Sequence, residues 1–395
     1  MLFWKIVLVA SFFIIMYNYI GYAIVAALIN KIAPKRLPVI SFTDLPSISF
    51  IVAAYNEEDV IEKKILNSLQ QNYPLSKVEF IFITDGSNDT TPSIVKKYPQ
   101  IVLLHSGERR GKSAALNRAI DSASNEILIM SDANTFLNSD AVKNIATHYC
   151  FSEVGGVAGE KKVMTYDEDK EGVGTREGLY WKYESFLKKV DSKFYSVVGA
   201  AGELFSVRKS LYEKLPDDVV LDDFIISLKV AQKGYRIIYE PKAYAMEVSS
   251  VSVKEEKKRK IRIAAGGFQA IKMLFPLFFF WKHWRLSFLY ISHRVLRWTL
   301  SPLCLITAFI SNAILAFGTS QLIFQLLFAI QALFYLTATF STFISSESKL
   351  KFLKIAGYFT FMNFSVILGF FRYLKGSQSA VWEKSKRSLQ NVDIS

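Results

Sequence analysis

Residues 49–57 read S-F-I-V-A-A-Y-N-E, a short apolar run that ends in polar side chains. Short apolar runs of this kind are typical of buried strands, so we expect a strand over residues 49–54. Residues 57–70 follow with apolar side chains at the spacing of one helix face. A strand followed by a helix is the repeating unit of α/β folds, and the stretch therefore predicts the fold class.

The alternation of strand and helix continues along the chain. Residues 79–84, 101–104 and 126–130 are further strand-like runs, and a helix opens at residues 111–113 with Ser113 as its expected N-cap. No internal repeat or low-complexity segment interrupts this pattern. We therefore predict an α/β domain with a doubly wound, mostly parallel sheet.

Polar side chains gather where three of these strands end. They are residues 55–57 (Y-N-E), 85–87 (D-G-S) and 132–134 (D-A-N). In doubly wound sheets, ligands bind outside the carboxyl ends of the strands. The coincidence predicts a nucleotide site at this edge, where Tyr55 would stack on a base, Glu57 would reach a ribose hydroxyl and Asp85 would accept a base N–H. Ordinary turns and helix starts are the alternative interpretation of these residues.

Two further groups are suited to a charged ligand. Asp132 and Asn134 lie two residues apart at a strand end, where their oxygens would hold a hard divalent cation that neutralises a diphosphate. A turn with a helix cap is the alternative. Residues 109–112 (R-R-G-K) precede a helix N-terminus, where backbone N–H groups favour an anion, although a solvated basic turn has the same pattern.

A pair of carboxylates, Asp222 and Asp223, opens the predicted helix over residues 225–232. A neighbouring like charge raises the pKa of a carboxyl group toward the range of a general base, although acidic residues are also common at helix N-termini. Residues 256–262 form a dense basic run, which predicts a surface helix on anionic lipid or an arginine that grips a diphosphate.

Both ends of the chain are strongly apolar. Hydrophobic residues make up 51% of the 395 residues, and residues 6–29, 298–346 and 355–371 contain no charge. Because a helix needs about 20 apolar residues to cross the hydrocarbon core, we expect one N-terminal span and about three C-terminal spans. Residues 318–320 (G-T-S) are the expected turn within the longest run.

Charge predicts how the chain lies in the membrane. Lys31, Lys35 and Arg36 follow the first span, which favours a cytosolic position for the residues after it. The net charge of +13 suits a multi-pass protein of the plasma or inner membrane, beside anionic lipid, better than a nucleic-acid-binding protein. Three later spans would put the C-terminus outside, yet the basic residues at 372–387 favour the cytosol. Either one apolar stretch is re-entrant, or residues 275–281 join a further membrane element.

Other site classes find little support. The two cysteines indicate neither a disulfide framework nor a metal cluster, and the four histidines have no ligand spacing.

The ordered set of motifs resembles a known family. It comprises A-A-Y-N-E at 53–57, D-G-S-N-D-T-T at 85–91, G-K-S-A-A-L-N at 111–117, S-D-A-N at 131–134, L-D-D-F at 221–224 and R-K-I-R-I at 259–263. This succession is similar to family 2 of the inverting glycosyltransferases, in particular to the membrane branch with cellulose, chitin, hyaluronan and poly-N-acetylglucosamine synthases. The resemblance covers roughly residues 45–275 and implies a GT-A-like nucleotide-diphospho-sugar transferase domain.

The resemblance also implies roles for individual residues. Asp223 would be the catalytic base, Asp132 and Asn134 would hold Mg²⁺ or Mn²⁺, and Arg262 would grip the diphosphate. The implied donor-binding residues are Tyr55, Glu57, Asp85, Lys112, Asp132 and Arg262. The implied acceptor-site residues are Gly202, Glu203 and Asp222. The implied partners are a nucleotide-sugar donor, most often with uridine, a glycan or lipid acceptor, membrane lipid and an accessory synthase subunit.

The chain departs from the family pattern at three motifs. Asn134 replaces the last Asp of D-x-D, and Leu221 and Asp222 replace the first two residues of T-E-D. Arg259 and Ile263 stand where Q-x-x-R-W has Gln and Trp. Because that Trp helps to form an acceptor platform in the synthases, two activities stay open: extension of an extracellular polysaccharide, and transfer of a single sugar to a membrane lipid.

Two other classes of protein agree less well with the sequence. A catalytically silent synthase subunit fits the altered motifs, but Asp132, Asp223 and Arg262 argue against it. A transporter is disfavoured because the stretch 298–346 carries no charged residue.

The expected organisation divides the chain into six segments. They are an N-terminal transmembrane helix (1–30), a linker (31–45), a cytosolic glycosyltransferase domain (46–250), basic interface helices (251–297), C-terminal transmembrane helices (298–374) and a tail (375–395).

Overall fold

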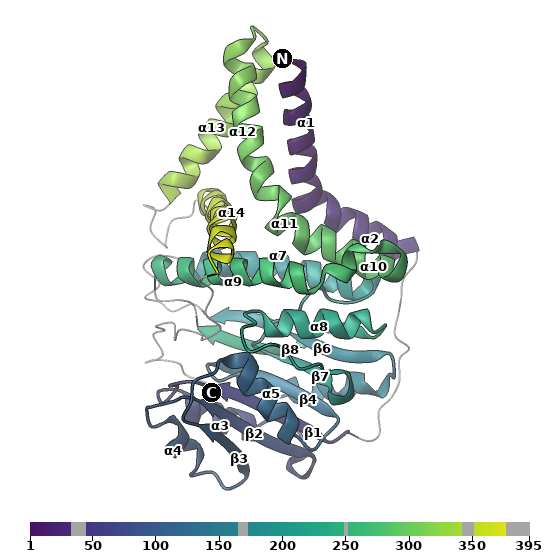
Figure 1. Ribbon diagram of the computed structural model, residues 1–395, viewed down its shortest axis with the longest axis vertical. Coiled ribbons are helices and arrows are strands. Elements are labelled where there is room, and N and C mark those ends of the chain that lie inside the picture. Colours follow the sequence, from purple (N-terminus) through teal and green to yellow (C-terminus); the bar gives the residue numbers. More distant parts are fainter. Residues whose placement is uncertain (33–44, 165–172, 249–251, 342–350, 377–395) are drawn as a thin grey trace.

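The computed structural model describes residues 1–32, 45–164, 173–248, 252–341 and 351–376. Figure 1 shows an α/β domain at one end of the molecule, a layer of helices across its face, and long apolar helices that extend away from it.

A single sheet of eight strands forms the centre of the α/β domain, in the order β3-β2-β1-β4-β7-β6-β8-β5. The first four strands in this order, β3, β2, β1 and β4, pair in parallel. The strands β7 and β5 pair antiparallel with their neighbours. The strands are β1 (Ile48–Ala54), β2 (Val78–Asp85), β3 (Ile101–Ser106), β4 (Ile127–Asp132), β5 (Thr135–Leu137), β6 (Val154–Met164), β7 (Phe205–Arg208) and β8 (Arg236–Val248). The predicted strands and the parallel first half are confirmed, and the second half makes the sheet mixed.

Helices cover both faces of this sheet, and a separate apolar core lies on each face. They are α3 (Ile61–Leu69), α4 (Thr91–Val95), α5 (Lys112–Ser122), α6 (Ala141–Ala146) and α8 (Asp222–Gln232). Ser113 is not the N-cap of α5: Gly111 takes that position, with φ +102°. That conformation suits glycine and turns the chain so sharply that the helix starts at Lys112.

A layer of helices lies between the sheet and the apolar helices (Figure 1). It contains α7 (Val173–Phe194), α9 (Val253–Met273), α10 (Phe280–Tyr290) and α11 (Leu296–Trp298). The basic run 256–262 lies in α9, which Ser252 caps by accepting a hydrogen bond from the Glu255 N–H at 3.3 Å. Residues 275–281 form a 3₁₀ turn and the start of α10 within this layer.

The apolar helices are α1 (Leu2–Met16), α2 (Tyr22–Ile32), α12 (Leu300–Gly318), α13 (Leu322–Phe340) and α14 (Lys351–Leu374). A π-helical turn over residues 17–21 joins α1 to α2, so the described part of the chain holds four helices that are long and apolar enough to cross a membrane. Figure 1 shows α1, α12 and α13 along the long axis, whereas α14 is seen almost end-on beside α9. The turn predicted at 318–320 connects α12 and α13.

Candidate active site

A cavity of about 690 Å³ opens between the carboxyl ends of β1 and β4 and the helices α7, α8, α9 and α14. Most of the predicted site residues line it: Glu57, Lys112, Asp132, Asn134, Gly202, Glu203, Asp222, Asp223 and Arg262. The sheet topology explains why Glu57, Asp132 and Asn134 converge, because they follow the parallel strands β1 and β4, which end at one edge.

Asp132 is the last residue of β4, and Asn134 lies in the tight turn before β5. Lys64 of α3 supports this turn from below. It is fully buried, and its ammonium donates to Ser131 Oγ at 2.7 Å and to the Thr135 carbonyl at 2.8 Å. Burial lowers the pKa of Lys64 to about 7, although Asp132 opposes the shift. Lys64 is a site residue that the sequence motifs did not indicate.

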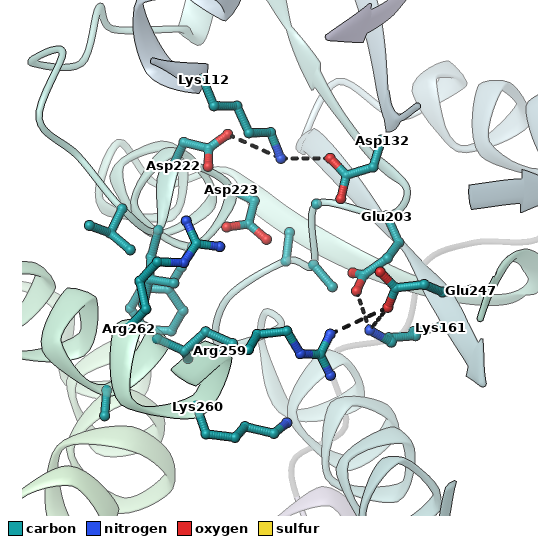
Figure 2. Close-up of a pocket in the computed structure, with 18 of the residues that line it drawn as sticks. Lys112, Asp132, Lys161, Glu203, Asp222, Asp223, Glu247, Arg259, Lys260 and Arg262 are labelled. Carbon is teal, nitrogen blue, oxygen red and sulfur yellow. Dashed lines mark hydrogen bonds and ion pairs between the residues drawn. The ribbon is translucent and has the colours of Figure 1, made fainter. Parts of the chain in front are cut away.

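Lys112, the first residue of α5, faces the Asp132 turn (Figure 2). Its Nζ lies 2.7 Å from Asp132 Oδ1 and 3.8 Å from Asp222 Oδ2. Burial alone would lower the pKa of Lys112, but the carboxylates of Asp132, Asp222 and Asp223 outweigh it and raise the pKa above its ordinary value. The ammonium is therefore a permanent positive charge at the strand edge.

Asp223 lies in the middle of the cavity (Figure 2), on the first turn of α8. Burial and the neighbouring Asp222 carboxylate raise the pKa of Asp223 to about 7, while Lys112 opposes the shift. A carboxylate with this pKa is poised to accept a proton near neutral pH.

Gly202 brings the charged groups together. A Cβ at this position would lie 2.9 Å from Lys112 Nζ, 3.5 Å from Asp223 Oδ2 and 3.6 Å from Asp132 Oδ2. Glycine therefore leaves room where these three side chains meet.

The opposite wall is built on Glu203, which pairs with the buried Lys161 of β6 at 2.6 Å. Lys161 also pairs with Glu247 of β8, and Arg259 of α9 lies 3.5 Å from Glu247 (Figure 2). Burial would raise the pKa of Glu203, but Lys161 outweighs it and the pKa is lowered. Lys161 and Glu247 belong to no motif, and their distance in sequence gave no signal of this contact.

Tyr55 and Asp85 lie outside the described lining of the cavity. Asp85 accepts hydrogen bonds from the N–H groups of Arg110 and Gly111 at 2.9 and 2.7 Å, and from Arg118 at 2.8 Å. The Arg109 guanidinium lies 3.6 Å from the centre of the Tyr55 ring. Both residues thus hold the loop that starts α5, and their predicted contacts with a nucleoside stay predictions.

Comparisons with known proteins agree with this geometry. The sequence profile of Glycosyl transferase family 2 matches residues 49–216. Over these residues the chain has the sequence pattern of family 2 glycosyltransferases. It is 28% identical over 244 residues to the poly-beta-1,6-N-acetyl-D-glucosamine synthase of Staphylococcus aureus, a match that covers 60% of this chain and 58% of the relative. The synthase of the same name from Staphylococcus epidermidis is 27% identical over 231 residues, with 57% and 55% covered.

The chain thus spans less than two thirds of the length of these relatives. A solved structure resembles this one over 94% of this chain and 99% of its own chain, with a TM-score of 0.71 and 23% identity. It is a mannosyltransferase from Pyrobaculum calidifontis in complex with GDP-Man and Mn²⁺. This likeness shows the GT-A-like fold. The match to the family profile implies a nucleotide-sugar donor.

The residues around Asp132 fit a divalent cation. No cluster of three or more His, Cys, Asp or Glu residues suited to a metal occurs among the described residues. The Asp132 carboxylate and the Asn134 amide nevertheless border the same cavity, and hard cations accept such oxygen ligands together with phosphate oxygens. Burial, with Glu203 and Glu247, raises the pKa of Asp132, so a cation here would stabilise its charged form.

Proposed function

We propose that this glycosyltransferase moves a sugar from a UDP-sugar to a growing cell-surface or extracellular polysaccharide, with inversion at the anomeric carbon. The observation that carries the proposal is Asp223, whose pKa is raised to about 7, in a cavity shared with Lys112 and Asp132. The relatives are named as synthases of poly-N-acetylglucosamine, which makes UDP-N-acetylglucosamine the first donor to test.

In this proposal the strand edge binds the donor. Glu57 contacts the ribose, Tyr55 and Asp85 contact the base, and Lys112 and Arg262 balance the charge of the diphosphate. Mg²⁺ or Mn²⁺, held by Asp132 and Asn134, would supply further neutralisation of the leaving group. The mannosyltransferase with the same fold is described with Mn²⁺.

The acceptor enters from the other side, beside Gly202, Glu203 and Asp222. Asp223 accepts the proton of the acceptor hydroxyl, whose oxygen attacks the anomeric carbon on the face opposite the diphosphate. The bond from that carbon to the diphosphate oxygen breaks as the new glycosidic bond forms. Because a single displacement occurs, the anomeric configuration inverts.

The test is the release of nucleoside diphosphate from a panel of UDP- and GDP-sugars by protein in nanodiscs with Mg²⁺ or Mn²⁺. Release from one donor that Asp223→Asn abolishes would support the proposal. Release that Asp223→Asn leaves unchanged would contradict the assigned base. Absence of release with every donor and a glycan acceptor would contradict the activity.

A single transfer to a membrane lipid is the second candidate, and one observation favours it. The cavity wall includes Met362 and Val366 of the apolar helix α14, and Ile263 stands where the synthases have the platform Trp. Product length separates the two: a polymer formed by the purified protein contradicts the lipid-only activity, and a single added sugar contradicts polymerisation.

We further infer that α1–α2, α12 and α13 cross the plasma or inner membrane, with the catalytic domain in the cytosol. Lys31 at the end of α2 favours this orientation. Two spans after the domain return the chain to the cytosolic side, where α14 lies on α9 (Figure 1). Ile355, Phe364 and Phe371 of α14 are 51–54% exposed, as expected for a helix in the lipid interface.

Cysteine labelling tests this orientation. In a background without Cys150 and Cys304, a membrane-impermeant maleimide should label Ser320→Cys in intact cells and Lys375→Cys only after permeabilisation. Labelling of Lys375→Cys in intact cells would show that α14 crosses the membrane.

A further inference from the structure

The apolar helix α14 is fastened to α9 at one close contact. A Cβ on Gly369 would lie 2.5 Å from Ala264 Cβ and 3.0 Å from the Ile261 carbonyl oxygen, so only glycine allows the two helices to approach this closely. The Phe370 ring lies 5.0 Å from the Phe268 ring, one turn further along α9. These contacts fix the last turns of α14 relative to α9.

The contact places Arg372 at the cavity. Arg372 follows Gly369 by one turn and lines the same cavity as Arg259 and Arg262 of α9. The pKa of Arg262 is lowered by burial and further by the charges of Arg259 and Arg372, while Asp222 and Asp132 oppose this effect. Guanidinium groups from the two helices thus line one cavity, where like charges repel each other.

Such a cluster of like charges costs free energy in a half-buried cavity unless an anion balances it. Arg259 lies 3.0 Å from Glu256 and 3.5 Å from Glu247, and these contacts fix its guanidinium group at the cavity. Guanidinium groups match phosphate oxygens because their N–H groups form a planar fork.

We propose that Arg372 joins Arg259 and Arg262 in a binding site for an organic phosphate or diphosphate, so that α14 is part of the substrate site. The inference rests on the proposed function, because a nucleotide-sugar donor carries a diphosphate. Two sources have this chemistry. One is the donor, whose diphosphate would extend from the Lys112 side, and the other is a lipid phosphate, whose chain would run along Met362 and Val366 of α14.

The experiment compares Arg372→Ala, Arg372→Lys and the control Lys375→Ala. Lys375 is a basic residue directly after the end of α14. Its side chain is exposed, and it is not among the residues that line the cavity. Binding of inorganic pyrophosphate, of UDP and of a prenyl phosphate is titrated with excess Mg²⁺, the first two in detergent and the last in nanodiscs. A melting temperature close to that of the wild type shows that a variant is folded. If Arg372→Ala does not fold, Arg372→Gln replaces it.

We expect Arg372→Ala to weaken pyrophosphate and UDP binding about 10- to 100-fold, because the substitution removes a hydrogen bond between charged groups. Arg372→Lys should recover part of this loss, and Lys375→Ala should match the wild type. If only prenyl phosphate binding weakens, the site holds a lipid phosphate and the proposal stands with that source. Unchanged binding of all three ligands by Arg372→Ala would overturn it. Wild-type protein that binds pyrophosphate but no nucleotide would contradict the proposed function, and weaker pyrophosphate binding by Arg372→Ala would still support this inference.

Discussion

The cavity has two walls that the chain builds in different ways. The donor wall, with Asp132 and Lys112, lies at the ends of parallel strands, and its residues come from short motifs directly after those strands. The opposite wall joins Lys161, Glu247 and Arg372 from an apolar helix and two strands that are distant in sequence but pair in the sheet. A site at strand ends is therefore determined by short stretches of sequence, whereas the facing wall depends on tertiary packing. Asp223 lies where the two walls meet.

Loss of the proposed cation site on the donor wall should have the largest effect on turnover. Asp132→Ala and treatment with EDTA should each lower turnover about 1000-fold, because a divalent cation contributes several kcal/mol to leaving-group stabilisation. Added Mn²⁺ should restore the EDTA-treated wild type but not the variant. Asp121→Asn, at a surface ion pair with Lys214, is the matched control. Full activity in EDTA would show that the donor wall works without a metal.

Loss of Lys112 should have the next largest effect. Lys112→Met removes a positive charge that is held within 2.7 Å of Asp132, and we expect turnover to fall about 100-fold, the usual cost of removing one preorganised electrostatic donor. Steady-state kinetics with Lys96→Met, an exposed lysine, as the control measure the change. Equal rates of the two variants would remove Lys112 from the donor wall.

The junction of the walls predicts a specific pH dependence. Activity should rise through pH 7 as Asp223 loses its proton, because burial and Asp222 hold its pKa at about 7. Asp222→Asn removes a like charge, so the pKa of Asp223 falls and the acidic limb of the profile moves to lower pH. Asp218→Asn, exposed on the neighbouring loop, should leave the profile in place. A limb that moves to higher pH would contradict the assigned electrostatics.

Lys64→Met should have the smallest effect. It removes two hydrogen bonds beneath the Asp132 turn, and we expect the unfolding free energy to fall by about 1–3 kcal/mol and the Mn²⁺ concentration for half activity to rise. Lys63→Met, on the exposed side of the same helix, is the control. Unchanged Mn²⁺ activation in a destabilised Lys64→Met would limit this lysine to a purely structural role.

The same contrast explains how much the sequence predicted. The strands and the place of Asp132 at a strand end followed from apolar periodicity and from polar residues after strands. The convergence of Asp132 with Asp222 and Asp223 followed only from the resemblance to the family. The hydrogen bonds that Asp85 accepts from the loop before α5 did not follow from the sequence. They depend on the backbone turn at Gly111, which the periodicity of apolar residues does not predict. The place of α14 was equally hidden, because its composition matches that of a transmembrane helix.

The most direct test of the account uses Asp223→Asn at the junction of the walls. UDP affinity and the rate of sugar transfer are measured on the same nanodisc preparation of the wild type and the variant. We predict that UDP affinity stays close to that of the wild type, because the donor wall is intact, while the transfer rate falls about 10²- to 10⁴-fold. A variant that keeps the wild-type transfer rate, or that loses UDP binding and transfer in parallel, would contradict the account.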